Sequence, residues 1–275
     1  MAELIGENAW LLAFWGAVAF LGALEFAIPE HRRPAHRGRR WPANFGLGIL
    51  NGLIASVVPV VSVSAAQWAA THGTGLLNVL ALPWWAGLLC VLTAVSGAQY
   101  ALHRAFHAVP ILWKVHRVHH SDIHLDVSSA LRFHPVEMIA VIAVMAPVAV
   151  ILGLPPILLA GYEMAQSIVG MVTHSNLRLP GAWGRMVRAV LVTPRIHRIH
   201  HSTDPAESNR NFANVFVAWD RWFGTYEEGS SHRAATRQYG LLDVGGDEAG
   251  NLAYLLELPF HAGNPAAEPR AQSDL

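Results

Sequence analysis

One seven-residue phrase occurs twice in this chain, and each copy contains three histidines. Residues 115–121 read VHRVHHS and residues 196–202 read IHRIHHS, while a third cluster, His103 and His107, precedes the first copy. With 16 histidines in 275 residues, an H-x-x-H-H window is expected by chance roughly 0.05 times. Because residues i, i+3 and i+4 lie on one face of a helix, we expect each cluster to direct its imidazoles at a common point.

These clusters predict a metal site, because neutral imidazole is the most common metal ligand in proteins. One ion does not require eight histidines, so we expect a two-metal centre. The predicted ligands in the clusters are His103, His107, His116, His119, His120, His197, His200 and His201. An all-nitrogen site suits iron, zinc, copper or nickel, and the clusters alone do not separate iron from zinc. The alternative is that these histidines are polar residues that cap membrane-spanning helices.

The composition indicates a membrane protein. Hydrophobic residues make up 53% of the chain and charged residues 14%, whereas soluble domains carry about 25% charged residues. The formal net charge is zero, so we expect no nucleic-acid partner. The lone cysteine, Cys90, excludes an intrachain disulfide, a cysteine-rich zinc module and a cysteine-ligated iron–sulfur cluster.

Five apolar segments have about the length needed to cross a bilayer. They cover roughly residues 9–28, 45–70, 83–102, 136–152 and 156–172. The last two are shorter and are joined by the turn 153–155, as in a re-entrant or tilted hairpin. The first segment lacks the positive flank of a signal peptide, so we expect it to be retained. The predicted fold is all-α, with four to five transmembrane helices and a histidine-rich helical cap.

The arginines predict the orientation of this multi-pass protein. The loop 31–41 holds five arginines, so it should be cytoplasmic, whereas the loops 71–82 and 153–155 hold no lysine or arginine. The N-terminus is then outside, and the C-terminus and all three histidine clusters are on the cytoplasmic face. We expect transmembrane helices in 1–102, a di-metal domain in 103–226 that includes the hairpin 136–172, and a surface segment and tail in 227–275.

The order H-x-x-x-H, H-x-x-H-H, H-x-x-H-H resembles the fatty acid hydroxylase superfamily, which includes the sterol desaturases. Residues 130–137 (ALRFHPVE), 173–176 (THSN) and 219–226 (WDRWFGTY) also look like that family. The resemblance covers about residues 100–226. It implies a non-haem centre of two iron ions, with zinc possible in the isolated protein, that uses O2 to hydroxylate or desaturate a sterol, a fatty acyl chain or a related lipid.

Further histidines and polar residues are predicted around the centre. His134 and His174 lie at predicted cytoplasmic ends of spans and are additional candidate ligands; the alternative is a helix-end histidine bonded to backbone carbonyls. Acceptors for the free N–H groups of ligand histidines are predicted at Asp122, Asp126, Asn214 and Asp220. For Asp122 and Asp220 the alternative is a helix cap or a salt bridge with an arginine. Arg117 and Arg198 are predicted to bind lipid phosphate or acidic neighbours.

Motifs for other cofactors are absent from the sequence. It contains no G-x-G-x-x-G, no Walker loop and no G-x-S-x-G, so an oxygenase of this kind would take electrons from a separate redox protein. One alternative is a membrane haem or electron-transfer protein, although haem uses single histidines on facing helices rather than triads. The other is a metal-binding membrane protein without catalysis.

Overall fold

The computed structural model describes residues 2–31, 37–58, 61–80, 82–179, 181–229 and 236–261, with side chains from residue 11 onward. Their regular secondary structure is helical, with three isolated β-bridges and no β-strand among the described residues. The all-α prediction is therefore confirmed for the described part of the chain.

The first part of the chain forms apolar helices. They are α1 (Ala2–Ala27), α2 (Arg37–Val57), α3 (Ser62–Thr71), the short α4 (Leu76–Val79), and a continuous run of α5 (Trp84–Cys90), the π-helical η1 (Val91–Val95) and α6 (Ser96–Ala108). The predicted segment 45–70 is divided between α2 and α3 rather than forming one helix. Pro59 stands between them in the sequence, and proline cannot donate the hydrogen bond that continues a helix.

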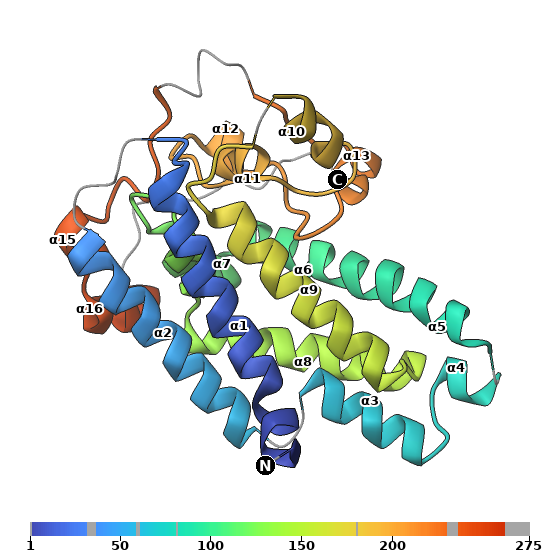
Figure 1. Cartoon of the computed structure of the whole chain (residues 1–275). Helices are drawn as coiled ribbons and strands as arrows, with labels where there is room; N and C mark the ends of the chain where they lie inside the picture. The colour runs from blue at the N-terminus through green and yellow to red at the C-terminus, as the bar shows by residue number, and fades with distance from the viewer. Residues whose placement is uncertain are drawn as a thin grey trace.

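The second part begins with α7 (Pro110–His120), the 3-10 helix η2 (Val127–Leu131), α8 (Pro135–Leu152) and α9 (Pro156–His174). Shorter helices follow: α10 (Gly181–Arg188), α11 (Pro194–His200), α12 (Pro205–Ser208), α13 (Ala218–Trp222), α15 (Gly246–Ala249), α16 (Leu252–Glu257) and the 3-10 helix η3 (Leu258–Phe260). The long helices lie side by side, and α10–α13 gather at one end of them, where α9 ends beneath α11 (Figure 1). This end carries the histidines.

Three stretches are long and apolar enough to cross a membrane, judged by length and composition: Arg37–Val79, Trp84–Ala108 and Pro135–Leu152. Within α1, Leu11–Ala27 is a shorter apolar stretch. The helix α9 covers the fifth predicted segment but is not among the three. The prediction of four to five spans therefore stays a prediction beyond these three.

Prolines and one glycine set the helix boundaries around the site. Pro110, Pro135, Pro156 and Pro194 each occupy the first turn of a helix, where the missing N–H of proline costs no helical hydrogen bond. Gly153 follows α8 with a φ of 65°, a left-handed conformation that glycine adopts without steric cost. This residue allows the tight reversal from α8 to α9.

A buried polar network joins α2 to the loop that follows α7. The Arg40 guanidinium donates to Asp122 Oδ2 at 2.8 Å and to Asp126 Oδ2 at 3.0 Å. The amide of Asn44 donates to the same Asp122 oxygen at 3.1 Å, and Arg132 donates to Asn44 Oδ1 at 2.8 Å. All five side chains are buried, so α2 is fixed to the segment that follows the histidine-bearing helix α7.

Glu25 connects α1 to two of those loops. Its Oε1 atom accepts from the backbone N–H of Val127 at 2.8 Å and from that of Asn176 at 2.7 Å. Val127 begins η2, after α7, and Asn176 follows the end of α9. A single carboxylate thus ties together the segments that follow two ligand-bearing helices.

Candidate metal centre

Nine of the ten histidines predicted as ligands come together in two buried groups. The first group comprises His103, His107, His116, His120 and His200, and the second comprises His119, His174, His197 and His201. Within each group the candidate ligand nitrogens all lie within 4.8 Å of one another. Each group can therefore surround one metal ion.

Each H-x-x-H-H phrase divides its histidines between the two groups, which differs from the common point expected for each cluster. The first and third histidines of a phrase share a group, and the second joins the other group: His116 and His120 against His119, and His197 and His201 against His200. Helical geometry gives the reason. Residues i and i+4 are about 40° apart around the axis, whereas i+3 and i+4 are about 100° apart. The two phrases thus build two sites jointly.

Backbone carbonyls fix the rings of four of these histidines. The Nδ1 atoms donate from His103 to Phe212 O (2.7 Å), from His119 to Arg132 O (3.1 Å), from His174 to Gly170 O (2.7 Å) and from His200 to Arg210 O (2.9 Å). Because a carbonyl oxygen only accepts, Nδ1 carries the proton in each ring. In a neutral ring the Nε2 atom then presents a lone pair.

Two of these lone pairs point at each other. The Nε2 atoms of His119 and His174 lie 3.1 Å apart, and neither has a proton to donate while its ring is neutral. Such a contact is repulsive unless a cation sits between the nitrogens. Two nitrogens bound at about 2.1 Å to one ion at a right angle lie about 3.0 Å apart. The spacing is therefore that of two ligands of one metal ion.

Burial keeps the rings neutral. For the six histidines of the two repeated phrases, burial lowers the pKa well below the ordinary value of 6.5, and neighbouring histidines lower it further; these are His116, His119, His120, His197, His200 and His201. Among the described residues, the buried Nε2 atom of His200 has no hydrogen-bond partner, and the Nε2 atoms of His197 and His201 lie 3.0 Å apart. Neutral, buried rings whose Nε2 atoms have no donor to accept from suit a bound metal.

His134 is the one predicted ligand that lies in neither group. It caps the N-terminus of α8, where its Nδ1 atom accepts from the backbone N–H of Val136 at 3.2 Å. Its Nε2 atom bonds to Leu256 O at 3.2 Å. Both ring nitrogens are therefore used, and the structure matches the alternative of a helix-end histidine.

The predicted outer acceptors occupy different positions. Asp122 and Asp126 bond to Arg40 rather than to a histidine. Although burial raises the pKa of a carboxyl group, Arg40 and Arg132 hold the pKa of Asp122 well below its usual range. The alternative of a salt bridge with arginine is the one that the structure shows for Asp122.

Asp220 acts on the site through the backbone. Its two carboxylate oxygens accept from the N–H of Phe212 at 2.8 Å and of Ala213 at 3.0 Å. The carbonyl of Phe212 in turn accepts from His103. Asp220 therefore positions His103 indirectly, through the backbone of Phe212. Asn214 lies beside the same histidine.

Glu137 is the functional candidate that the sequence predictions missed. Its Oε1 atom lies 2.7 Å from Nδ1 of His116, and its side chain is buried. A signal was present, because Glu137 is the single acidic residue in the apolar helix α8. An acidic residue inside such a helix needs a polar partner, and that partner is a histidine at the site.

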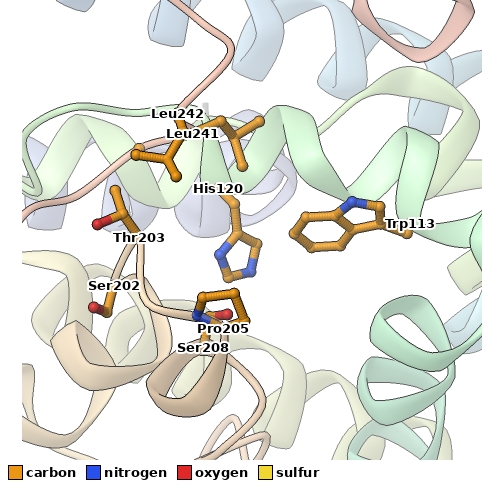
Figure 2. A pocket seen from close by; sticks show the side chains of 9 residues that line it. Trp113, His120, Ser202, Thr203, Pro205, Ser208, Leu241 and Leu242 are labelled. Carbon is orange, nitrogen blue, oxygen red and sulfur yellow. The ribbon is translucent and has the colours of Figure 1, made fainter. Parts of the chain in front are cut away.

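Aromatic rings cover the histidines. Phe133 stacks on His119 with ring centroids 4.4 Å apart, and Phe106 stacks on His116 at 5.3 Å. A pocket reaches His120 from the side of α12, and Figure 2 shows Trp113 beside the His120 ring at its edge. Its lining residues are Trp113, His120, Ser202, Thr203, Pro205, Ser208, Gly240, Leu241 and Leu242.

The arginines within the repeated phrases have protein partners. Arg117 pairs with Asp243, which is one of the two kinds of partner predicted for it. Arg198 is buried and donates to Ser175 O at 2.9 Å and to Asn176 Oδ1 at 3.2 Å. Both arginines hold neighbouring segments against the ligand helices.

Comparison with known proteins identifies the family. The sequence profile of the fatty acid hydroxylase family matches residues 88–225, half of the chain, and this range contains all nine clustered histidines. The chain belongs to the fatty acid hydroxylase family. The resemblance seen in the histidine motifs is thereby confirmed.

Several curated relatives align with this fatty acid hydroxylase family member. It is 31% identical over 152 residues to alkylglycerol monooxygenase of Danio rerio, covering 54% of this chain and 33% of the relative. Identity to ornithine lipid hydroxylase of Rhizobium tropici is 32% over 127 residues, covering 46% and 38%. Identity to alkylglycerol monooxygenase of Xenopus tropicalis is 28% over 199 residues, covering 70% and 43%. The chain thus spans less than half the length of these relatives. No solved structure matches it.

Proposed function

We propose that this chain is a membrane-bound, non-haem di-iron oxygenase that hydroxylates a lipid with O2. The observation that carries the proposal is the contact between two lone pairs, on His119 and His174, within a buried all-histidine group. Imidazole suits iron better than it suits magnesium or calcium. Iron is favoured by membership of the fatty acid hydroxylase family, and zinc accepts the same nitrogens in an isolated protein.

The proposed reaction combines a lipid C–H bond with one O2, two electrons and two protons, and it yields a C–OH group and one water. Bound iron would supply the reduction of O2 and the oxidising power that breaks the C–H bond. The electrons come from a separate redox protein, because the sequence has no flavin or nicotinamide motif. Hydroxylation is favoured over desaturation, since the relatives are named a monooxygenase and a hydroxylase.

The side chains of this protein orient and shield the centre. Carbonyl acceptors hold the rings of His103, His119, His174 and His200 in one tautomer, so their Nε2 atoms face inward. Phe106 and Phe133 stack on ring faces and keep water away. A dry, fixed shell of this kind lowers the reorganisation that a reaction at the centre requires.

The lipid reaches the site from the bilayer. The candidate ligands His103 and His174 lie towards the C-terminal ends of α6 and α9, and the stretch Trp84–Ala108, which includes α6, is apolar enough to cross a membrane. The arginines of the loop 31–41 favour the cytoplasmic side for this end of the bundle. In this proposal 1–102 are transmembrane helices, 103–226 form the di-metal domain, and 227–275 form the surface segment and tail.

The test is metal analysis combined with turnover. The full chain is purified in detergent, loaded anaerobically with Fe(II), and its metal content is measured per chain. We expect two ions per chain, and we expect O2-dependent incorporation of one oxygen atom from 18O2 into a lipid supplied with a reduced redox partner. One ion or none after loading, or a product without 18O, overturns the proposal.

A further inference from the structure

Polar side chains interrupt the apolar contact between α6 and α9 near the metal centre. The Gln99 amide donates to Gln166 Oε1 at 2.6 Å, and the Tyr162 hydroxyl donates to Gln99 Oε1 at 3.2 Å. Gln99 and Tyr162 are buried, whereas Gln166 is half-buried. In a helix within a bilayer, such polar residues are costly and point to a functional site.

This polar pair lies one helical turn from a candidate ligand. Gln99 precedes His103 by four residues on α6, so both side chains lie on the same face about 6 Å apart along the axis. The second glutamine, Gln166, lies two turns before His174 on α9. The pair is therefore placed between the apolar part of the bundle and the histidines.

The link between the two glutamines uses only the amide oxygen of Gln166. The Nε2 atom of Gln166 carries two N–H groups, and within the described residues it donates to no partner. Because Gln166 is half-buried among apolar helices, a free amide there costs free energy unless a ligand accepts from it. The pair thus has donors to offer at a position that a lipid can reach.

The neighbouring residues of α9 extend the polar character. Glu163, one turn before Gln166, accepts a hydrogen bond from Ser62 on α3. These polar residues lower the mean hydropathy of α9, which is not among the stretches apolar enough to cross a membrane. The helix α9 therefore has polar residues, Glu163 and Gln166, at positions that face α3 and α6.

We propose that Gln99 and Gln166 form a binding site for an oxygen atom of the lipid substrate, an ether or carbonyl oxygen close to the carbon that is oxidised. The Gln166 N–H groups donate to this oxygen, and Gln99, held by Tyr162, fixes the orientation of the Gln166 amide. The lipid is then placed with a neighbouring methylene one helical turn away, next to His103. This inference rests on the proposed function and names the substrate class for that site.

The first experiment measures lipid binding without turnover. The full chain, as isolated and without an electron donor, is placed in nanodiscs, and displacement of a fluorescent lipid probe is followed. Three competitors are used: an alkylglycerol with an ether oxygen, an acylglycerol with a carbonyl oxygen, and an analogue with methylene in place of the oxygen. We expect at least one oxygen-containing lipid to bind about three- to tenfold more tightly than the analogue, as one hydrogen bond allows; the stronger of the two identifies the oxygen.

The second experiment repeats this comparison with variants. Gln166→Met preserves side-chain length but removes the donors, so it should bring the preference close to unity while leaving affinity for the methylene analogue unchanged. Ser167→Ala is the matched control, because the Ser167 hydroxyl donates only to Glu163 O of its own helix at 2.8 Å. This control should keep the full preference.

Three results overturn the inference. The first is equal binding of all three competitors to the unmodified chain, which requires no variant. The second is a preference that survives Gln166→Met, and the third is an equal loss of all three ligands in that variant, which marks a structural link. A preference for oxygen without any turnover would overturn the proposed function alone, whereas turnover without such a preference would overturn this site alone.

Discussion

The carboxylate of Glu137 lies 2.7 Å from Nδ1 of His116, on the nitrogen opposite the one available to a metal. The other anchored rings described above donate to neutral backbone carbonyls. A carboxylate is a stronger acceptor than a carbonyl, so His116 becomes the most basic of the anchored ligands. The first group of histidines therefore contains one ring that differs electronically from the rest.

Glu137→Gln tests this relationship. Burial disfavours the charged form of the Glu137 carboxyl group, so its negative charge depends on a cation bound on the other side of His116. The amide keeps the shape and an acceptor oxygen but cannot carry that charge, so we expect metal affinity of the first group, or lipid oxidation, to fall about 10–100-fold. Iron binding and turnover are measured side by side. Glu257→Gln, an exposed acidic residue at the end of α16, is the control and should behave as the unmodified chain. Equal effects of the two substitutions would contradict the assignment.

Two single substitutions, one in each group of histidines, should each cause the loss of one metal ion. His119→Ala belongs to the second group and His200→Ala to the first, so neither can replace the other despite the repeated phrases. We expect each variant to lose activity and to bind about one ion fewer after Fe(II) loading. His72→Ala, at an exposed histidine outside both groups, should retain full metal content. Normal turnover of the His119 variant would refute its assignment as a ligand.

Much of the site could be predicted from the sequence, because the spacing of histidines on helices is local information. Nine of the ten predicted ligands are brought together. His134 differs because its ring caps the N-terminus of α8. The sequence does not reveal whether a histidine at such a position caps a helix or binds a metal. The grouping was missed as well. Helix geometry separates the second histidine of each phrase from the first and third, but which histidines of α7 and α11 share a group depends on how the two helices face each other.

The partners outside the ligand rings could not be predicted, because they come from tertiary contacts. The carbonyl that accepts from His103 belongs to Phe212, more than a hundred residues away. Asp122 and Asp126 are used by Arg40 from α2, another distant contact. The apolar segments predicted the long helices. The break between α2 and α3 was missed, because the length of the segment was considered without the effect of Pro59 in its sequence.

Asp220→Asn should loosen the loop that anchors His103. One carboxylate oxygen accepts from Ala213 N–H, and an amide placed there would set one donor against another. We expect the free energy of unfolding to fall by about 1–3 kcal/mol, with a lower iron content. The measurement is thermal unfolding together with metal analysis. Asp204→Asn, which affects an exposed cap of α12, should cost less and should leave the iron unchanged.

Arg40→Met should be strongly destabilising. It leaves the buried carboxylates Asp122 and Asp126 without their shared cation, and breaking such a pair costs about 3–5 kcal/mol. Arg39→Met is the matched control, because the ion pair of Arg39 with Asp247 is exposed and contributes about 0–1 kcal/mol to stability. Chemical unfolding of both variants in the same detergent is the measurement. Equal stability of the two would show that the network contributes little.

The orientation in the membrane follows from the same arginines. Arg40 is paired with buried carboxylates, but the loop 31–41 still carries four other arginines, and the positive-inside rule favours the cytoplasmic side for it. We therefore predict an outside N-terminus and a cytoplasmic C-terminus. Alkaline phosphatase fused to the C-terminus in a bacterial host should be inactive, while a green fluorescent protein fusion at the same position should fluoresce. Active phosphatase at the C-terminus would reverse the orientation and would place the histidine groups on the opposite face of the membrane.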